Sequence, residues 1–157
     1  MDKIVLHKNL NGDTRTAPKN VSFSDVQNAN DMHRMDVYFV LSALGRMCIE
    51  RSIYHDHTKT EHDEMFYADF CSTLQNGTSF IDGEWYKMHI TEERHHLSSH
   101  CPEDVNLLDV LEMVADCTCA GLTRSGKIYD LDLDPEILQR AVKNTVELIT
   151  SMVTVED

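Results

Sequence analysis

Residues 24–48 read SDVQNANDMHRMDVYFVLSALGRMC, and this stretch decides the fold class. Ser24 is a suitable N-cap residue, and Asp25 places an acidic side chain in the first turn. Apolar residues then recur at helical spacing, at Val26, Ala29, Met32, Val37, Val40, Leu41, Leu44, Met47 and Cys48. The pattern predicts a long helix that begins at Ser24.

The rest of the chain shows helical spacing in four shorter stretches, which cover residues 61–75, 83–96, 107–120 and 137–153. Gly121 is expected to stop the third of these helices, and Asp134-Pro135-Glu136 is a strong start signal for the fourth. Residues 1–23 lack such a pattern, so we expect an irregular arm with at most an isolated strand or hairpin. A chain of 157 residues has room for one ordinary domain. We therefore predict an all-α fold, with a single helical domain over residues 24–157 after the arm.

The composition limits the partners and the compartment. The chain has 14 basic and 27 acidic side chains, which gives a formal net charge of −13. Because nucleic-acid affinity comes mostly from neutralisation of phosphates by Lys and Arg, this charge argues against a nucleic-acid polymer as partner. No apolar run approaches the ~20 residues that span a bilayer, and residues 1–11 lack the pattern of a secretory signal. Five cysteines without a Cys-x-x-Cys pair indicate reduced thiols, so we expect a cytoplasmic protein without a membrane partner.

The doublet His55-Asp56 is the most informative feature for function. His33 precedes it and Asp116 follows it, and imidazole nitrogens combined with carboxylate oxygens suit a divalent transition metal. On one straight helix, His33 and His55 would share a face but lie roughly 33 Å apart, at 1.5 Å per residue. A common ion therefore requires the chain to reverse between them, and Gly45 is the residue there that favours a break. Taken alone, the doublet is weak evidence for a metal site, and a polar helix end is the more ordinary explanation.

A second ion becomes conceivable because three more histidines lie between the doublet and Asp116, at His89, His95 and His96. On a helix over residues 83–96, His89 would share one polar face with Glu93 and His96.

The helix at 107–120 carries Asp109, Glu112 and Asp116 on one side. Such a row is ordinarily a solvated acidic stripe. Asp116, however, stands among apolar residues, and a buried carboxylate needs a metal ion or an arginine as partner. Asp116 is therefore a candidate metal ligand.

The order His33, His55-Asp56, Asp116 resembles that of the HD-domain superfamily, which comprises helical metal-dependent phosphohydrolases named for this doublet. Over residues 30–120 the chain looks more closely like an uncharacterised branch of HD-like proteins from bacteria and their phages. The pieces that carry this similarity are His55-Asp56-His57-Thr58-Lys59, Glu64, Tyr67, Trp85, His89, His95-His96 and Glu112-Met113-Val114-Ala115-Asp116.

The resemblance implies roles for several of these residues. Asp56 would bridge two ions, and His89 with one of His95 or His96 would bind the second ion. Lys59 matches a basic residue that often follows the doublet, which implies a phosphate contact or an ion pair with a ligand carboxylate. Arg94 is a second candidate for contacting phosphate.

We therefore expect a phosphohydrolase that acts on a small phosphorylated molecule, with a nucleotide as the favoured substrate. One or two divalent transition metals (Fe, Mn, Zn, Co or Ni) would activate water, and Lys59 or Arg94 would offset developing charge. Glu93 or an unligated histidine would move protons. A di-iron oxygenase with the same ligands and a non-catalytic helical module that binds a ligand or a protein stay open as alternatives. The C-terminal helix would cover the core or the seam of a homodimer.

Overall fold

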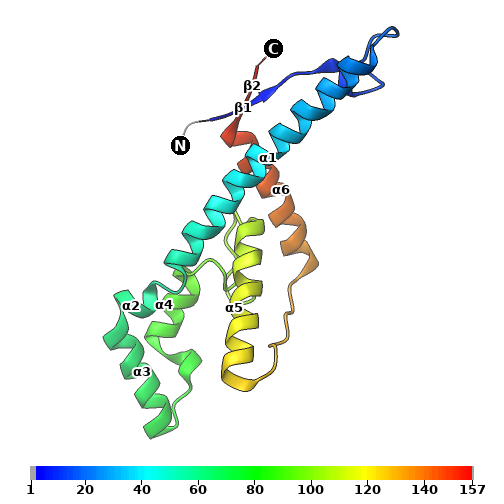
Figure 1. Cartoon of the computed structure of the whole chain (residues 1–157). Coiled ribbons are helices and arrows are strands. Elements are labelled where there is room, and N and C mark those ends of the chain that lie inside the picture. Colours follow the sequence, from blue (N-terminus) through cyan, green and yellow to red (C-terminus); the bar gives the residue numbers. More distant parts are fainter. Residues whose placement is uncertain (1–2, 157) are drawn as a thin grey trace. The chain divides into compact units, whose positions relative to one another are not determined.

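The computed structural model describes residues 3–156, and most of them are helical, as the sequence predicts. The helices are α1 (Phe23–Tyr54), α2 (Thr58–Glu61), α3 (Asp63–Asn76), α4 (Glu84–Glu92), α5 (Leu107–Ser125) and α6 (Pro135–Met152), with two short strands, β1 (Ile4–His7) and β2 (Val153–Glu156) (Figure 1). Within the described residues, no helix is both long and apolar enough to cross a membrane.

The chain divides into two compact units. The first takes in the described residues of Met1–Met47 and Val146–Asp157, and the second is Cys48–Thr145. The expected division, between an arm at 1–23 and a domain at 24–157, is different, because the first part of α1 belongs with the arm.

The first unit joins the two ends of the described chain. β1 pairs with β2 in parallel, from Ile4 opposite Val153 to His7 opposite Glu156, and Figure 1 shows the two strands together. The backbone nitrogen of His7 also donates to the Asp36 carboxylate of α1 at 3.3 Å. The sequence predicts at most an isolated strand or hairpin in the arm and extends the last helix to Val153. That helix ends at Met152 instead, because the β-branched residues that follow favour a strand.

Helix α1 corrects one prediction directly. It runs without a break from Phe23 to Tyr54, so the reversal expected near Gly45 does not occur. Glycine permits a break but does not cause one, and its cost inside a helix is only about 1 kcal/mol relative to alanine. The flanking Leu44, Arg46 and Met47 are good helix formers, so the helix continues.

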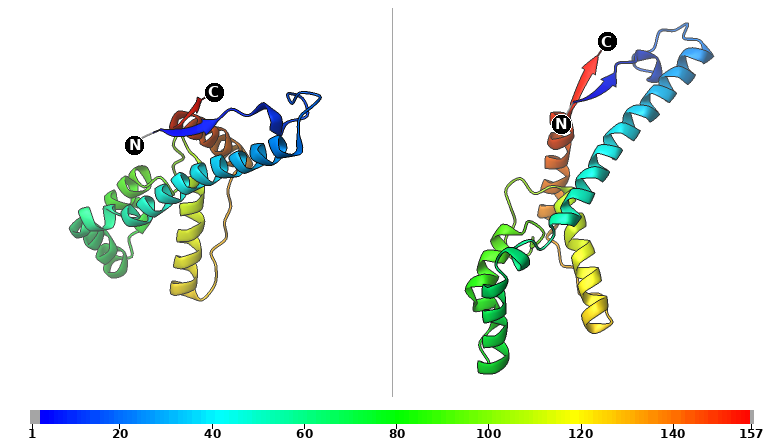
Figure 2. Two further views of the ribbon diagram at one scale, coloured as in Figure 1. Left: turned by 45° about the horizontal axis from the view of Figure 1, so that its top comes forward. Right: turned by 60° about the vertical axis from the view of Figure 1, so that its left-hand side comes forward.

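The second unit holds the end of α1, helices α2 to α5 and the first part of α6. Its buried core contains Leu97, Val105, Met113 and Ala141. Helices α3 and α4 run alongside each other in both views of Figure 2. Their contact is an aromatic cluster of Phe66, Phe70, Phe80 and Trp85.

Two helix ends in this unit differ from prediction. α4 ends at Glu92 because Glu93 is extended, so His95 and His96 lie in a turn after the helix rather than on its face. α5 continues past Gly121 to Ser125 and is capped by Gly126, whose φ is 73°. Gly121 serves a close approach instead, because a Cβ there would lie 2.5 Å from the backbone oxygen of Lys127.

Candidate metal centre

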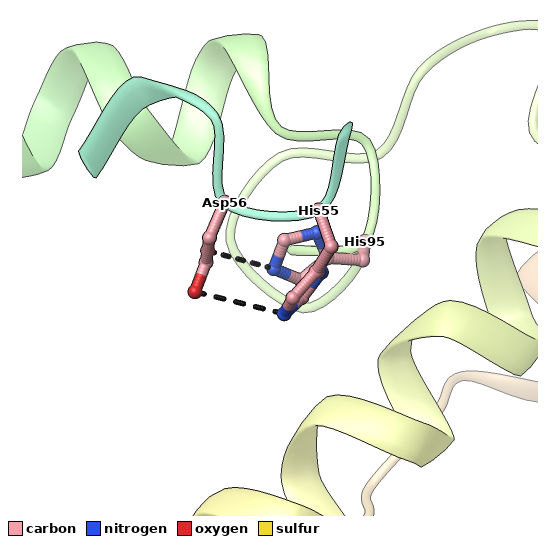
Figure 3. Close-up of side chains that lie close together, drawn as sticks. All are labelled: His55, Asp56 and His95. Carbon is pink, nitrogen blue, oxygen red and sulfur yellow. Dashed lines mark ion pairs between the residues drawn. The ribbon is translucent and has the colours of Figure 1, made fainter. Parts of the chain in front are cut away.

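The turn between α1 and α2 presents the His55-Asp56 doublet. Asp56 has a φ of 56°, in the left-handed region that non-glycine residues seldom adopt. Aspartate tolerates this conformation better than most residues, yet it still costs of order 1 kcal/mol, and such strain is concentrated at functional sites. Figure 3 shows the result: the side chains of His55, Asp56 and His95 converge although they come from two separate segments.

His55, Asp56 and His95 form what we call the first metal group, because each offers one ligand atom within 4.8 Å of the others. His55 Nε2 lies 3.6 Å from Asp56 Oδ2, and His95 Nε2 lies 3.7 Å from Asp56 Oδ1. Asp116, on α5, adjoins the group with Oδ1 at 3.5 Å from His55 Nε2. Ligands held about 2.1 Å from one ion at a tetrahedral angle lie about 3.4 Å apart, so these separations suit a shared ion.

Asp56, His89 and His96 form the second metal group, which shares Asp56 with the first. His89 Nε2 lies 3.5 Å from Asp56 Oδ1 and 2.8 Å from His96 Nε2. Two ligands at a right angle on one ion are about 3.0 Å apart, so the two imidazoles suit adjacent positions on an ion. Both members of the His95-His96 pair are used, one in each group.

Three buried polar atoms at the junction of the two groups have no hydrogen-bond partner among the described residues. They are Asp56 Oδ1 and both ring nitrogens of His95, whose side chain is 1% exposed. Buried polar atoms in folded proteins are nearly always satisfied, so an unsatisfied cluster of this kind needs an explanation. A divalent cation bound to Asp56 Oδ1 and His95 Nε2 would satisfy two of them, while His95 Nδ1 lies 3.3 Å from Glu112 Oε1.

The charges around the groups also fit cation binding. Burial opposes ionisation of Asp56, but Lys59 together with His55 and His89 holds the pKa of the carboxyl below its usual value. Hydrogen bonding to His55 likewise lowers the pKa of Asp116. Burial lowers the pKa of His89 to about 4, and it also lowers the pKa of His96, so both are neutral ligands near pH 7. Asp116 and Glu112 raise the pKa of His55 to about 10, so His55 has to lose a proton before it can bind an ion.

The structure therefore brings together six of the seven metal ligands that the sequence predicts, namely His55, Asp56, His89, His95, His96 and Asp116. His33 does not join them. It lies in the first unit, on the uninterrupted helix α1, so the reversal that its role required is absent.

Lys59 contacts the metal groups through Asp56. Its Nζ donates to Asp56 Oδ2, so of the two roles left open for Lys59 the structure shows the ion pair with a ligand carboxylate. About a third of the Lys59 side chain stays exposed, and it lines a cleft beside the metal groups.

Arg94 and Glu93 do not hold the positions that catalytic roles would need. Arg94 donates to Asp109 through Nε and Nη2 and to Asp104 through Nη1, so carboxylates already occupy its guanidinium. Glu93 is buried, and its Oε1 accepts hydrogen bonds from the backbone and hydroxyl of Thr58. These contacts do not suit the phosphate-contact role expected for Arg94 or the proton-transfer role expected for Glu93.

Glu112 and Thr58 contact ligand histidines, and the sequence does not predict either contact. Glu112 lies one helical turn before Asp116, where the helical spacing alone predicts part of a solvated acidic stripe. Its Oε1 lies instead 3.0 Å from His55 Nδ1. Thr58 is fully buried, and its Oγ1 lies 2.7 Å from His89 Nδ1. Helical spacing gives a signal for Glu112, whereas Thr58 stands in the stretch that resembles the HD family but has no pattern that predicts its burial.

A cleft of about 510 Å³ opens beside the second metal group. The polar residues that line it include Asp56, Lys59, His89, His96, Asp116 and Arg124, and its aromatic residues are Phe66, Phe70, Phe80, Trp85 and Tyr86. A separate cleft of about 370 Å³ reaches His55 of the first group. Glu112 and Asp116 also line it, with Leu108, Leu111 and Ala115 among its apolar residues.

Comparison with known proteins gives one finding. Residues 23–153 match the model of a protein family described as a family of unknown function, DUF5662, and this range contains both metal groups. Searches of the curated proteins and of the solved structures gave no match.

Proposed function

We propose that this chain, which belongs to the DUF5662 family, is a metal-dependent phosphohydrolase that acts on a small phosphorylated molecule. One observation carries the proposal: Asp56 is shared by two histidine groups, and its buried Oδ1 faces histidine nitrogens without a hydrogen-bond partner among the described residues. A carboxylate shared between two cation sites is typical of centres that clamp a phosphoryl group.

The ligands divide between two ions. His55, His95 and Asp116 would hold one ion, His89 and His96 the other, and Asp56 would bridge them. This mixture of nitrogen and oxygen ligands accepts Fe, Mn, Zn, Co or Ni. Bound ions would polarise phosphoryl oxygens and lower the pKa of water toward 7.

Lys59 supplies a second source of positive charge at the same place. Because its ammonium group contacts Asp56 and lines the cleft, it is within reach of a phosphate that enters beside the metal groups. The chain as a whole carries a formal net charge of −13, so an anionic substrate depends on local charge of this kind.

The cleft favours a substrate with a flat ring. Its volume of about 510 Å³ falls within the ordinary range for small-molecule sites. Phe70 and Tyr86 line it, and aromatic faces stack well on planar rings. A nucleotide, with its phosphate at the ions and its base among these rings, meets both conditions.

The test begins with elemental analysis of the purified protein, followed by a screen of nucleotides and generic phosphoesters with each metal added back. We expect close to two transition-metal ions per chain and hydrolysis of at least one nucleotide. Asp56→Ala should remove both the bound metal and the activity. His33→Ala is the matched control, because it removes a histidine outside the two groups and should change neither.

Two results would contradict the proposal. Two iron ions with a mixed-valent spin signal and no phosphoester turnover would indicate the oxygenase. Absence of stoichiometric metal, together with unchanged stability in Asp56→Ala, would indicate a non-catalytic module.

A further inference from the structure

We infer that two separate supports fix the ligands of the two ions: Glu112 orients the histidines of the first metal group, and Thr58 with Glu93 orients His89 of the second. This inference rests on the proposed metal site and assigns positioning residues within it. It predicts that each ion can be weakened without the other.

Glu112 faces the back of the first group. Its Oε1 lies 3.0 Å from His55 Nδ1 and 3.3 Å from His95 Nδ1. A carboxylate only accepts hydrogen bonds, so its position favours the proton of each ring on Nδ1. A neutral imidazole then has its lone pair on Nε2, and the Nε2 atoms of both rings face Asp56. One side chain thus selects the ligand atom of two histidines.

A chain of ion pairs holds Glu112 itself. Arg51 Nη1 donates to Glu112 Oε2 at 3.2 Å and also to Asp109 Oδ1. Asp109 is fully buried, accepts two further bonds from Arg94 and closes the capping box at the start of α5. Glu112 is therefore anchored on the side that faces away from the histidines. Arg94, which does not contact the metal groups, acts at the far end of this chain.

Thr58 determines which ring nitrogen of His89 carries the proton. The Thr58 hydroxyl has one hydrogen, and it lies 2.7 Å from both Glu93 Oε1 and His89 Nδ1. The Glu93 carboxylate only accepts, so the hydroxyl donates to Glu93 and accepts from His89 Nδ1. The lone pair of His89 is then on Nε2, the atom that faces Asp56 and His96.

Several contacts hold the Glu93 carboxylate and the ring of His89 in place. The backbone nitrogen of Thr58 and the Nδ1 atom of His57 also lie 3.0 Å from its Oε1, which fixes the carboxylate. Stacking on Trp85, with ring centroids 4.4 Å apart, holds the plane of His89. Within the described part of the chain, no hydrogen bond or ion pair joins Glu112 to His89 or His96, or Thr58 to His55 or His95. The two supports therefore act on different histidines.

The experiment measures metal binding rather than turnover. The metal-free protein is titrated with Co²⁺ in competition with a chelator, and the two dissociation constants and the visible absorption of each bound ion are recorded. Glu112→Gln should weaken one ion about 10- to 100-fold, which is the usual effect of losing such a partner. Glutamine can present its oxygen to only one side, so its amide nitrogen must face either Arg51 or the histidines, which are all donors.

Thr58→Val should weaken the other ion by a similar factor, because valine keeps the shape but removes the hydroxyl. Thr58→Ser should restore binding. Thr91→Val is the matched control, since the Thr91 hydroxyl bonds only to the Lys87 carbonyl on α4, and it should leave both constants unchanged. Thermal unfolding of each metal-free variant checks that it folds.

The ions are identified by combining variants. Glu112→Gln should weaken the single ion that remains in His96→Ala, and Thr58→Val should weaken the one that remains in His95→Ala. Equal weakening of both ions by either support variant would overturn the inference. Two ions without phosphoester turnover would overturn the proposed function and leave this inference standing, whereas a wild-type chain that binds no ion would overturn both.

Discussion

Asp56 combines an unusual backbone with an unusual side chain. Its φ of 56° is a conformation that favours glycine, and its carboxylate contacts Lys59 and the histidines of both groups. This backbone conformation has an energetic cost, but it places the Asp56 carboxylate between two sets of histidines. Replacement variants can separate these two properties.

We predict that metal-free Asp56→Gly is more stable than metal-free Asp56→Ala by about 1 kcal/mol. Both variants lose the carboxylate and its ion pair with Lys59, so the difference reports the left-handed backbone alone. Urea unfolding in the presence of a chelator measures it. If the alanine variant were equally stable, the backbone at this position would not be strained, and its conformation would not need a functional reason.

His55 leads to a prediction about protons. Hydrogen bonds with Asp116 and Glu112 raise its pKa to about 10 in the metal-free protein, so at pH 8 the ring is charged. Metal binding needs the neutral ring and should release about one proton from His55. His89 and His96, whose pKa values are lowered, should release none.

The apparent affinity of the first metal group should therefore rise with pH, by up to about tenfold per unit, until pH passes the pKa of His55 near 10. Calorimetric titration in two buffers with different ionisation enthalpies counts the protons. Binding at pH 8 without proton release would show that His55 is neutral or is not a ligand.

At the scale of elements, two of the glycines do not act as the sequence predicts. The sequence favours a helix break at Gly45 and predicts a helix end at Gly121. In the structure, α1 continues through Gly45 and α5 continues through Gly121. The start of α6 was predicted correctly, because the Asp134 carboxylate accepts from the Glu136 backbone as an N-cap should. Caps act through neighbouring atoms and can be predicted locally, whereas the purpose of Gly121 depends on a segment that folds back onto it.

These two glycines give opposite predictions for the same change. Gly45→Ala should stabilise the protein by about 0.5–1 kcal/mol, because no atom lies within 4 Å of the added Cβ and alanine favours the helix. Gly121→Ala should destabilise it by about 1–3 kcal/mol, because the Cβ would lie 2.5 Å from the Lys127 oxygen and 2.7 Å from the Tyr129 nitrogen. Urea unfolding followed by circular dichroism compares the two variants with wild type. A stabilised Gly121→Ala would mean that the segment after α5 does not pack there.

At the scale of the molecule, the sequence predicts which residues form the site better than it predicts the elements that position them. Six of the seven expected ligands come together, but α4 does not continue to His96 as the helical wheel assumed. His89 and His96 meet because the chain turns after Glu92. Glu112 and Thr58 could not be assigned, since a polar side chain on a helix shows its partner only when other elements are placed around it. The parallel pairing of the two chain ends was missed for the same reason.

Removal of metal should separate the two units by their stability. The ligands come from the turn after α1, from α4 and the turn that follows it, and from α5, all within Cys48–Thr145. An ion that binds only the folded form stabilises it by about 4 kcal/mol at a thousandfold excess over its dissociation constant. Chelation should therefore speed amide exchange in α2, α4 and α5 by up to about a thousandfold.

The paired amides of β1 and β2, which bond to each other in the first unit, should not change. Hydrogen exchange read by mass spectrometry tests this, with His33→Ala expected to behave as wild type. Equal loss of protection in both units would show that the ions stabilise the whole chain, and no loss in either would remove the case for a metal centre.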